Sequence, residues 1–358
     1  MGGDGILREN VGRWNMKANV LFLESPPGVG FSYDSSISPP LLANDTSTTA
    51  DSLSALMDFY GTFPLSQSVG LFLSGESYAG IYVPWLARAV LASSSLPLRG
   101  ILVGNGALKT NDVYEGNLTM QRAQHAYNHG LFSAPLKHSI DAACVNWTAP
   151  RSSACETLLS EMANQIGPLN SYDIEVTCAP GQQQRALLGS VSHQAAPPSS
   201  THASSVNVCS AADLALTAYM NQPDVLEALH VAPGKASLGP WAECADGTLS
   251  YFREPCDEMT DVYPGLLEKL QVLIYNGDQD ECIPYLQDAA WTRDMGFPVK
   301  TDWRPWILDN QVAGYVTEFE TPTRFTFATV KQAGHEVPMY QPERALAMVQ
   351  RFIAGESL

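Results

Sequence analysis

A serine lies between an apolar run and a set of small residues in the sequence GLFLSGESYAGIYVP, residues 70–84. Gly75 stands two positions before Ser77, and Ala79 stands two positions after it. This layout is typical of a nucleophile elbow, a strained strand-to-helix turn that exposes a serine hydroxyl and accepts only small neighbours. An ordinary turn serine is the alternative, because short motifs of this kind also occur by chance.

A serine hydroxyl is a weak nucleophile unless a base takes its proton and an acid orients that base. Asp278 and Asp280 directly follow the apolar run LQVLIY, and His335 lies between the last apolar run and the last helical pattern. The order serine, acid, histidine is that of the α/β-hydrolases. Turn-forming aspartates and an exposed loop histidine are the alternatives. Spacing alone leaves Asp278 and Asp280 both open as the acid.

Five apolar runs must position these side chains. Their apolarity is continuous rather than alternating, which predicts buried parallel strands with helices on both faces. The runs are residues 18–25, 70–74, 100–106, 270–278 and 324–334. Helical periodicity lies between and after them, in residues 49–63, 78–93 and 342–355. This alternation predicts an α/β fold with a mostly parallel central sheet flanked by helices.

The pattern becomes polar, helical and cysteine-containing from about residue 112. We interpret residues 112–262 as an inserted helical cap between two parts of an α/β core, residues 1–111 and 263–358. Within the cap, residues 181–206 are rich in Gln, Ser, Ala and Pro. Such a composition predicts an exposed, flexible loop and a candidate site of proteolytic processing.

Composition narrows the class of protein. The 358 residues suffice for one large domain with an insertion or for two domains, and the net charge of −17 argues against a nucleic-acid partner. No apolar run is long enough to span a membrane, and no signal peptide is visible at the N-terminus.

The seven cysteines include no C-x-x-C pair, so we expect disulfides in an oxidising compartment rather than a metal site. Sequons make Asn44, Asn117 and Asn146 candidate glycosylation sites.

Six ordered motifs resemble the serine carboxypeptidase family, the group that contains cathepsin A and the vacuolar and plant enzymes. They are ESPPGVGFSY, GESYAGIYVP, GNG, NQPDVLEALHV, YNGDQDECIP and AGHEVPMYQPERAL. The resemblance implies an α/β-hydrolase fold with a helical cap and the release of single C-terminal residues from peptides at acidic pH, without cofactor or metal. It also implies a lysosomal, vacuolar or secreted full-length protein and is compatible with a homodimer.

The same resemblance implies a role for each matching residue. Ser77 is expected to be the nucleophile, His335 the base, and Asp280, the second aspartate of the family's G-D-x-D pattern, the orienting acid. The backbone N–H of Tyr78 is expected to donate to the oxyanion, and Glu76 to bind the substrate's terminal carboxylate. A carboxyl group binds a carboxylate only when one of the two holds a proton, which favours low pH. For Glu76, a solvated elbow residue is the alternative.

The resemblance also implies disulfides, and it shows that one family motif is missing from this sequence. Cys144 with Cys155, and Cys178 with Cys209, resemble cap bridges, and Cys244 resembles a family cysteine whose partner lies nearer the N-terminus. That partner belongs to an N-G-G-P-G-C motif that this sequence does not contain, and the same motif supplies the second oxyanion donor. We therefore expect an N-terminally incomplete serine carboxypeptidase that, as written, is weakly active or inactive.

Two other functions are weighed against this one. A serine carboxypeptidase-like acyltransferase or esterase would use the same three side chains, with an alcohol rather than water resolving the acyl-enzyme. A non-catalytic binding homologue would keep the fold and lose the chemistry, but Ser77, Asp280 and His335 are all present.

Overall fold

The computed structural model describes residues 6–36, 40–64, 68–93, 96–108, 112–148, 150–176, 211–231, 239–242, 248–254 and 259–358. The predicted loop 181–206 and the cysteines Cys178, Cys209 and Cys244 lie outside these ranges. Among the described residues, no helix combines the length and the apolarity that a membrane crossing requires.

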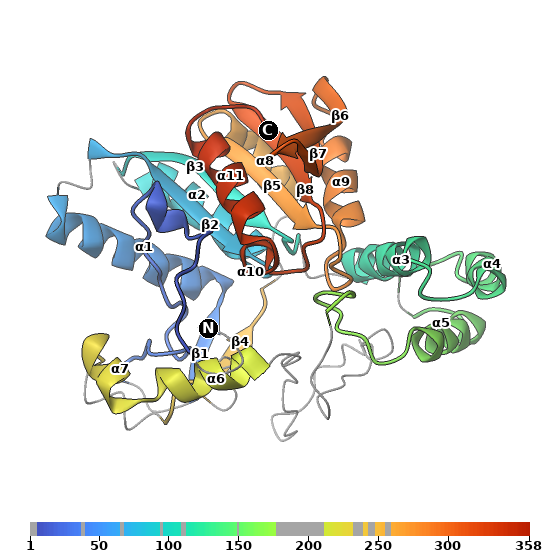
Figure 1. Cartoon of the computed structure of the whole chain (residues 1–358), viewed down its shortest axis with the longest axis horizontal. Coiled ribbons are helices and arrows are strands. Elements are labelled where there is room, and N and C mark those ends of the chain that lie inside the picture. The colour runs from blue at the N-terminus through green and yellow to red at the C-terminus, as the bar shows by residue number, and fades with distance from the viewer. Residues whose placement is uncertain are drawn as a thin grey trace.

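Strands and helices alternate in the first and last parts of the chain (Figure 1). The strands are β1 (Leu41–Asn44), β2 (Leu71–Glu76), β3 (Leu98–Gly104), β4 (Leu249–Phe252), β5 (Gln271–Gly277), β6 (Val299–Leu308), β7 (Gln311–Glu320) and β8 (Arg324–Val330). The helices are the short 3-10 helix η1 (Trp14–Met16) and α1 (Asp45–Thr62), α2 (Ala79–Ser93), α3 (Asp112–Asn128), α4 (Ala134–Ala143), α5 (Ser153–Ile166), α6 (Ala211–Met220), α7 (Pro223–Ala228), α8 (Met259–Leu267), α9 (Tyr285–Asp294), α10 (Val337–Tyr340) and α11 (Pro342–Ile353).

The central sheet has six strands in the order β2-β3-β5-β8-β7-β6. The first four are parallel, and they correspond to four of the five predicted runs. The hairpin of β6 and β7 continues the sheet with antiparallel pairing and was not predicted. The fold class, an α/β sheet flanked by helices, is therefore as predicted, with an antiparallel extension at one edge.

Both faces of the parallel strands are buried. On one face, Ile101 and Ile274 join a core that includes side chains of α1, α2, α8 and α9. On the other face, Leu102 and Leu273 join a second core that includes side chains of α11. Successive residues of one strand thus enter opposite cores, which explains why these strands are continuously apolar.

The predicted strand at residues 18–25 is wrong. These residues form no strand, and the segment is exposed, with Phe22 89% and Leu21 49% accessible. A strand needs a hydrogen-bonding neighbour, and β2 ends the described sheet without one on its outer side. The apolar pattern identified a segment suited to a strand, but within the described ranges nothing pairs with it.

Helices α3, α4 and α5 form a unit with its own apolar core, which includes Ile140 and Leu159. A disulfide joins Cys144 to Cys155 within this unit, the pairing that the resemblance implied. Figure 1 shows these helices projecting from the sheet beside α9. The unit lies inside the predicted cap of residues 112–262.

The cap boundaries remain a prediction, although two elements complicate them. Strand β4, within the predicted cap, pairs with β1 of the core, and α8 begins before residue 262 yet packs in the core of the main sheet.

Of the three sequons, Asn117 and Asn146 are exposed. The Asn44 side chain instead caps α1 by accepting from the Ser47 N–H at 2.7 Å.

Helix α2 approaches the segment after β3 so closely at Gly80 that no side chain fits there. A Cβ on Gly80 would lie 2.2 Å from the carbonyl oxygen and 2.6 Å from the nitrogen of Ala107. Both are backbone atoms and cannot rotate away. Packing against the backbone of Ala107 therefore requires a glycine at residue 80, one position beyond the small residue of the elbow motif.

We predict that Gly80→Ala lowers the free energy of unfolding by about 1–3 kcal/mol, because the added methyl group must displace backbone. The matched control is Gly61→Ala in α1, where a Cβ would meet nothing within 4 Å. This variant is expected to raise the free energy of unfolding by about 0.5 kcal/mol, since alanine loses less backbone entropy than glycine in a helix. Urea unfolding measures both, and equal midpoints for the two variants would contradict the packing argument.

Candidate active site

The three predicted catalytic residues follow three strands of the parallel part of the sheet. Ser77 comes directly after β2, Asp280 after β5, and His335 after β8 (Figure 1). Parallel strands present their carboxyl ends at one edge of a sheet, where ligands of open α/β folds bind. The topology therefore carries residues far apart in sequence to the same edge.

Ser77 occupies the tight turn between β2 and α2. Its φ of 60° lies in the left-handed region, which a residue with a side chain seldom adopts. The Ser77 N–H donates to the carbonyl of Gly104 at 3.0 Å, and its carbonyl accepts from the N–H groups of Gly80 and Ala107, both at 2.9 Å. Three backbone hydrogen bonds thus hold the strained turn that the elbow motif predicted.

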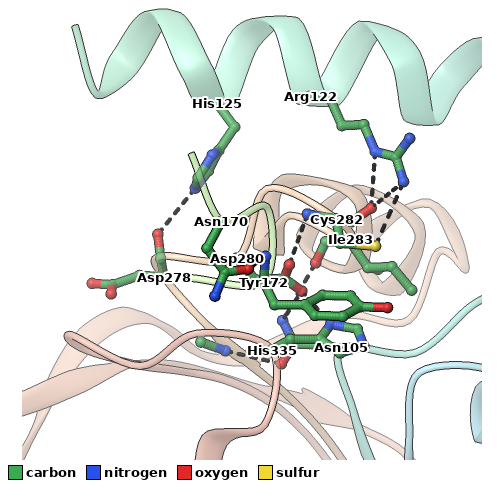
Figure 2. A network of polar contacts seen from close by, with 11 residues as sticks. Asn105, Arg122, His125, Asn170, Tyr172, Asp278, Asp280, Cys282, Ile283 and His335 are labelled. Atoms are coloured by element: carbon green, nitrogen blue, oxygen red, sulfur yellow. Dashed lines mark hydrogen bonds and ion pairs between the residues drawn. The ribbon is translucent and has the colours of Figure 1, made fainter. Parts of the chain in front are cut away.

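Asp280 and His335 form a buried pair (Figure 2). Nδ1 of His335 lies 2.7 Å from Oδ2 of Asp280, and the two residues are 3% and 0% exposed. The same Oδ2 accepts from Nδ2 of Asn105 at 2.7 Å, and Oδ1 accepts from the N–H of Cys282 at 2.7 Å. Three donors compensate a carboxylate that has lost its water.

Of the two aspartates that spacing left open, Asp280 is the one that contacts the imidazole. The Asp278 carboxylate accepts instead from the N–H of Gln332 at 2.7 Å and from Nε2 of Gln279 at 2.9 Å. It therefore ties the loop after β5 to the loop after β8. Asp278 has the role of a turn-stabilising residue, which was the alternative considered for it.

Asn105 belongs to the site, although the sequence assigned it no role. Its Nδ2 donates to Asp280, and its Oδ1 accepts from the N–H of Gly277 at 3.0 Å. Asn105 is fully buried and has a φ of 40°. The available signal was a polar residue between two glycines at the end of an apolar run, within the quoted GNG motif.

Tyr172 is a second residue that sequence reasoning missed. Its ring stacks on the His335 ring with centroids 4.7 Å apart and an interplanar angle of 18°. Its carbonyl accepts from the His335 N–H at 2.7 Å, and the neighbouring Ser171 carbonyl accepts from the N–H groups of Glu281 and Cys282. A segment that follows α5 in the chain thus binds both the loop after β5, here called the acid loop because it carries Asp280, and the loop after β8 that carries His335.

The second imidazole nitrogen, Nε2 of His335, is buried and has no hydrogen-bond partner among the described residues. Burial opposes a charge on this ring, but the adjacent Asp280, with help from Glu336 and Glu76, outweighs it and raises the pKa of His335 to about 9. At a pH below this pKa of about 9 the ring carries a proton on both nitrogens, and Nε2 can act as a base only after it has released that proton.

Glu76 and Tyr78 flank the serine. Burial, together with the charges of Glu336 and Asp280, raises the pKa of Glu76 to about 7, although His335 counteracts this shift. The Tyr78 hydroxyl donates to Oδ1 of Asp45 at 2.9 Å, and this contact anchors the residue whose N–H was predicted to bind the oxyanion. Within the described ranges, no group of three His, Cys, Asp or Glu side chains is placed to hold a metal ion.

Known proteins resemble this chain in sequence and in fold. A family model described as serine carboxypeptidase matches residues 2–355. Serine carboxypeptidase-like 21 of Arabidopsis thaliana is 33% identical over 397 residues, which cover 99% of this chain and 78% of the relative. The lysosomal protective protein of Mus musculus is 33% identical over 395 residues, with the same two coverages of 99% and 78%.

A solved structure agrees in fold. Kex1(delta)p, a prohormone-processing carboxypeptidase of Saccharomyces cerevisiae, superposes with a TM-score of 0.72 at 21% identity, covering 99% of this chain and 77% of that one. The order of the motifs, the family match along nearly the whole chain and this superposition agree. The chain belongs to the serine carboxypeptidase family, a family of hydrolases.

Proposed function

We propose that this chain is a serine-type carboxypeptidase that releases C-terminal amino acids from peptides through an acyl-enzyme. The observation that carries the proposal is the buried Asp280–His335 pair, with Nε2 of His335 unengaged, at the sheet edge that also holds the strained Ser77 turn. An exposed loop histidine, the alternative weighed from sequence, would have neither the burial nor the carboxylate partner.

In each half-reaction of the proposed mechanism, His335 acts first as a base and then as an acid. Nε2 of His335 takes the proton of the Ser77 hydroxyl as the oxygen attacks the last peptide carbonyl, and then gives it to the leaving amine. Asp280 stabilises the imidazolium that forms between these transfers. The Tyr78 N–H donates to the oxyanion, and water then resolves the acyl-enzyme by the same route.

Glu76 explains why such an enzyme would favour acidic pH. Below about 7, Glu76 holds a proton and can donate it in a hydrogen bond to the substrate's terminal carboxylate. The charge of Glu76 is also one of the charges that raise the pKa of His335, so protonating Glu76 makes the neutral, basic imidazole easier to form. Protonation of Glu76 therefore favours substrate binding and weakens the hold of His335 on its own proton, but a lower pH does not itself increase the neutral form of His335.

We also propose that the protein works in a lysosomal, vacuolar or extracellular setting. A disulfide between Cys144 and Cys155 is typical of an oxidising compartment, and one of the relatives is named lysosomal protective protein. The proposed dependence on a protonated Glu76 fits an acidic compartment.

Covalent labelling tests the nucleophile. A fluorophosphonate probe forms a bond from its phosphorus to an activated serine oxygen and expels fluoride, and it needs no complete turnover. We expect the chain to label slowly, in line with the weak activity predicted from its sequence. Ser77→Ala should abolish this labelling, and Ser93→Ala, at the exposed end of α2, should leave it unchanged. Labelling that survives in Ser77→Ala would reject the assigned nucleophile.

The pH dependence tests Glu76. The free-acid and C-terminal-amide forms of one N-blocked dipeptide share the titration of His335, so the ratio of their kcat/KM values isolates the terminal carboxylate. We expect this ratio to fall as pH rises through about 7, where Glu76 ionises and repels the carboxylate. In Glu76→Gln the ratio should become independent of pH between about 5 and 8, a range that includes the Glu76 pKa of about 7. A ratio that falls equally in both proteins contradicts this role.

A further inference from the structure

Two side chains of helix α3 form hydrogen bonds with the loop that carries Asp280 (Figure 2). Arg122 donates from Nε and Nη2 to the carbonyl of Cys282, at 2.9 and 2.6 Å. Nε2 of His125 lies 3.0 Å from the carbonyl of Asp278. The two accepting carbonyls belong to residues two positions after and two positions before Asp280. The two gripping side chains are three residues apart and so extend from neighbouring positions on one helix.

From this arrangement we propose that Arg122 and His125 are positioning residues, which fix the Asp278–Cys282 loop so that Asp280 meets Nδ1 of His335. The proposal rests on the function assigned to Asp280 above. Neither side chain is within the predicted reacting set, and each acts through backbone of the acid loop.

The loop needs such support because it lies between elements. Strand β5 ends at Gly277 and α9 begins at Tyr285, so the residues between them lack the regular hydrogen bonds of a helix or a strand. A carbonyl withdrawn from water without a donor is destabilising. Arg122 gives the Cys282 carbonyl two N–H groups from one rigid planar group, which restrains its direction as well as its position.

The His125 contact holds across the acidic range. His125 is fully buried, and burial lowers its pKa to about 4, with His129 contributing in the same direction. A carbonyl can only accept, so Nε2 must carry the proton of the neutral ring. The ring is neutral at a pH above this pKa of about 4, and the proton that it gains below that pH goes to Nδ1, so the Nε2–H hydrogen bond to Asp278 does not depend on the titration of the ring.

Labelling kinetics of the full chain test the proposal. Arg122→Gln should lower the rate constant of fluorophosphonate labelling at Ser77 by about 10- to 100-fold, by analogy with the loss seen when residues that orient a metal ligand are replaced. Arg122→Lys keeps the charge and one donor and should recover part of this rate. The matched control is Arg151→Gln, because Arg151 also donates to a backbone carbonyl of the same helical unit, that of Trp147 at 2.8 Å, but away from the acid loop.

A second readout does not depend on catalysis. The proton between Nδ1 of His335 and Asp280 gives a low-field ¹H NMR signal, which we expect to shift or broaden in Arg122→Gln and in His125→Phe and to stay unchanged in Arg151→Gln. If the wild-type chain does not label, but the signal shifts in Arg122→Gln and His125→Phe, the positioning role is supported and the proposed function is rejected. Wild-type labelling rates and unshifted signals in both Arg122→Gln and His125→Phe would overturn the positioning role.

Discussion

One short hydrogen bond, between Nδ1 of His335 and Oδ2 of Asp280, organises the rest of the site. A carboxylate as deeply buried as Asp280 destabilises the folded state unless hydrogen-bond donors surround it. An imidazole without a partner at Nδ1 would be free to rotate about its side-chain bonds. The donors come from separate parts of the chain: Asn105 after β3, Cys282 within the acid loop, and His335 after β8. The pair can therefore exist only when these loops are folded against one another.

Sequence alone predicted the parts of the fold that depend on local pattern. Continuous apolar runs identified β2, β3, β5 and β8, because strands buried on both faces leave that trace. The hairpin of β6 and β7 was missed, since β6 is largely exposed and lacks an apolar run. Its two-residue turn, Asp309-Asn310, with positive φ at both residues, was the usable signal. The run at 18–25 failed for the opposite reason, because pattern shows suitability for pairing but not whether a partner is present.

The site divides in the same way. Ser77 and His335 could be proposed from sequence because each follows a strand and lies in a recognisable motif, whereas the choice between Asp278 and Asp280 needed either family resemblance or the structure. Tyr172 and Arg122 left no local trace, since their contacts with the site span more than a hundred residues of chain. Such contacts depend on how segments far apart in the chain pack together, and no spacing rule predicts that packing.

Helix α3 and the segment around Tyr172 contact the loops after β5 and β8, whereas α4 and α5 pack on α3 through a core of their own and are tied together by a disulfide. Contact with the site and outward extension thus belong to different helices of one unit. In evolutionary terms, the outer pair of helices can lengthen, shrink or change its surface while α3 is preserved. A lineage could in this way vary the outer helices without rebuilding the loops that carry Asp280 and His335.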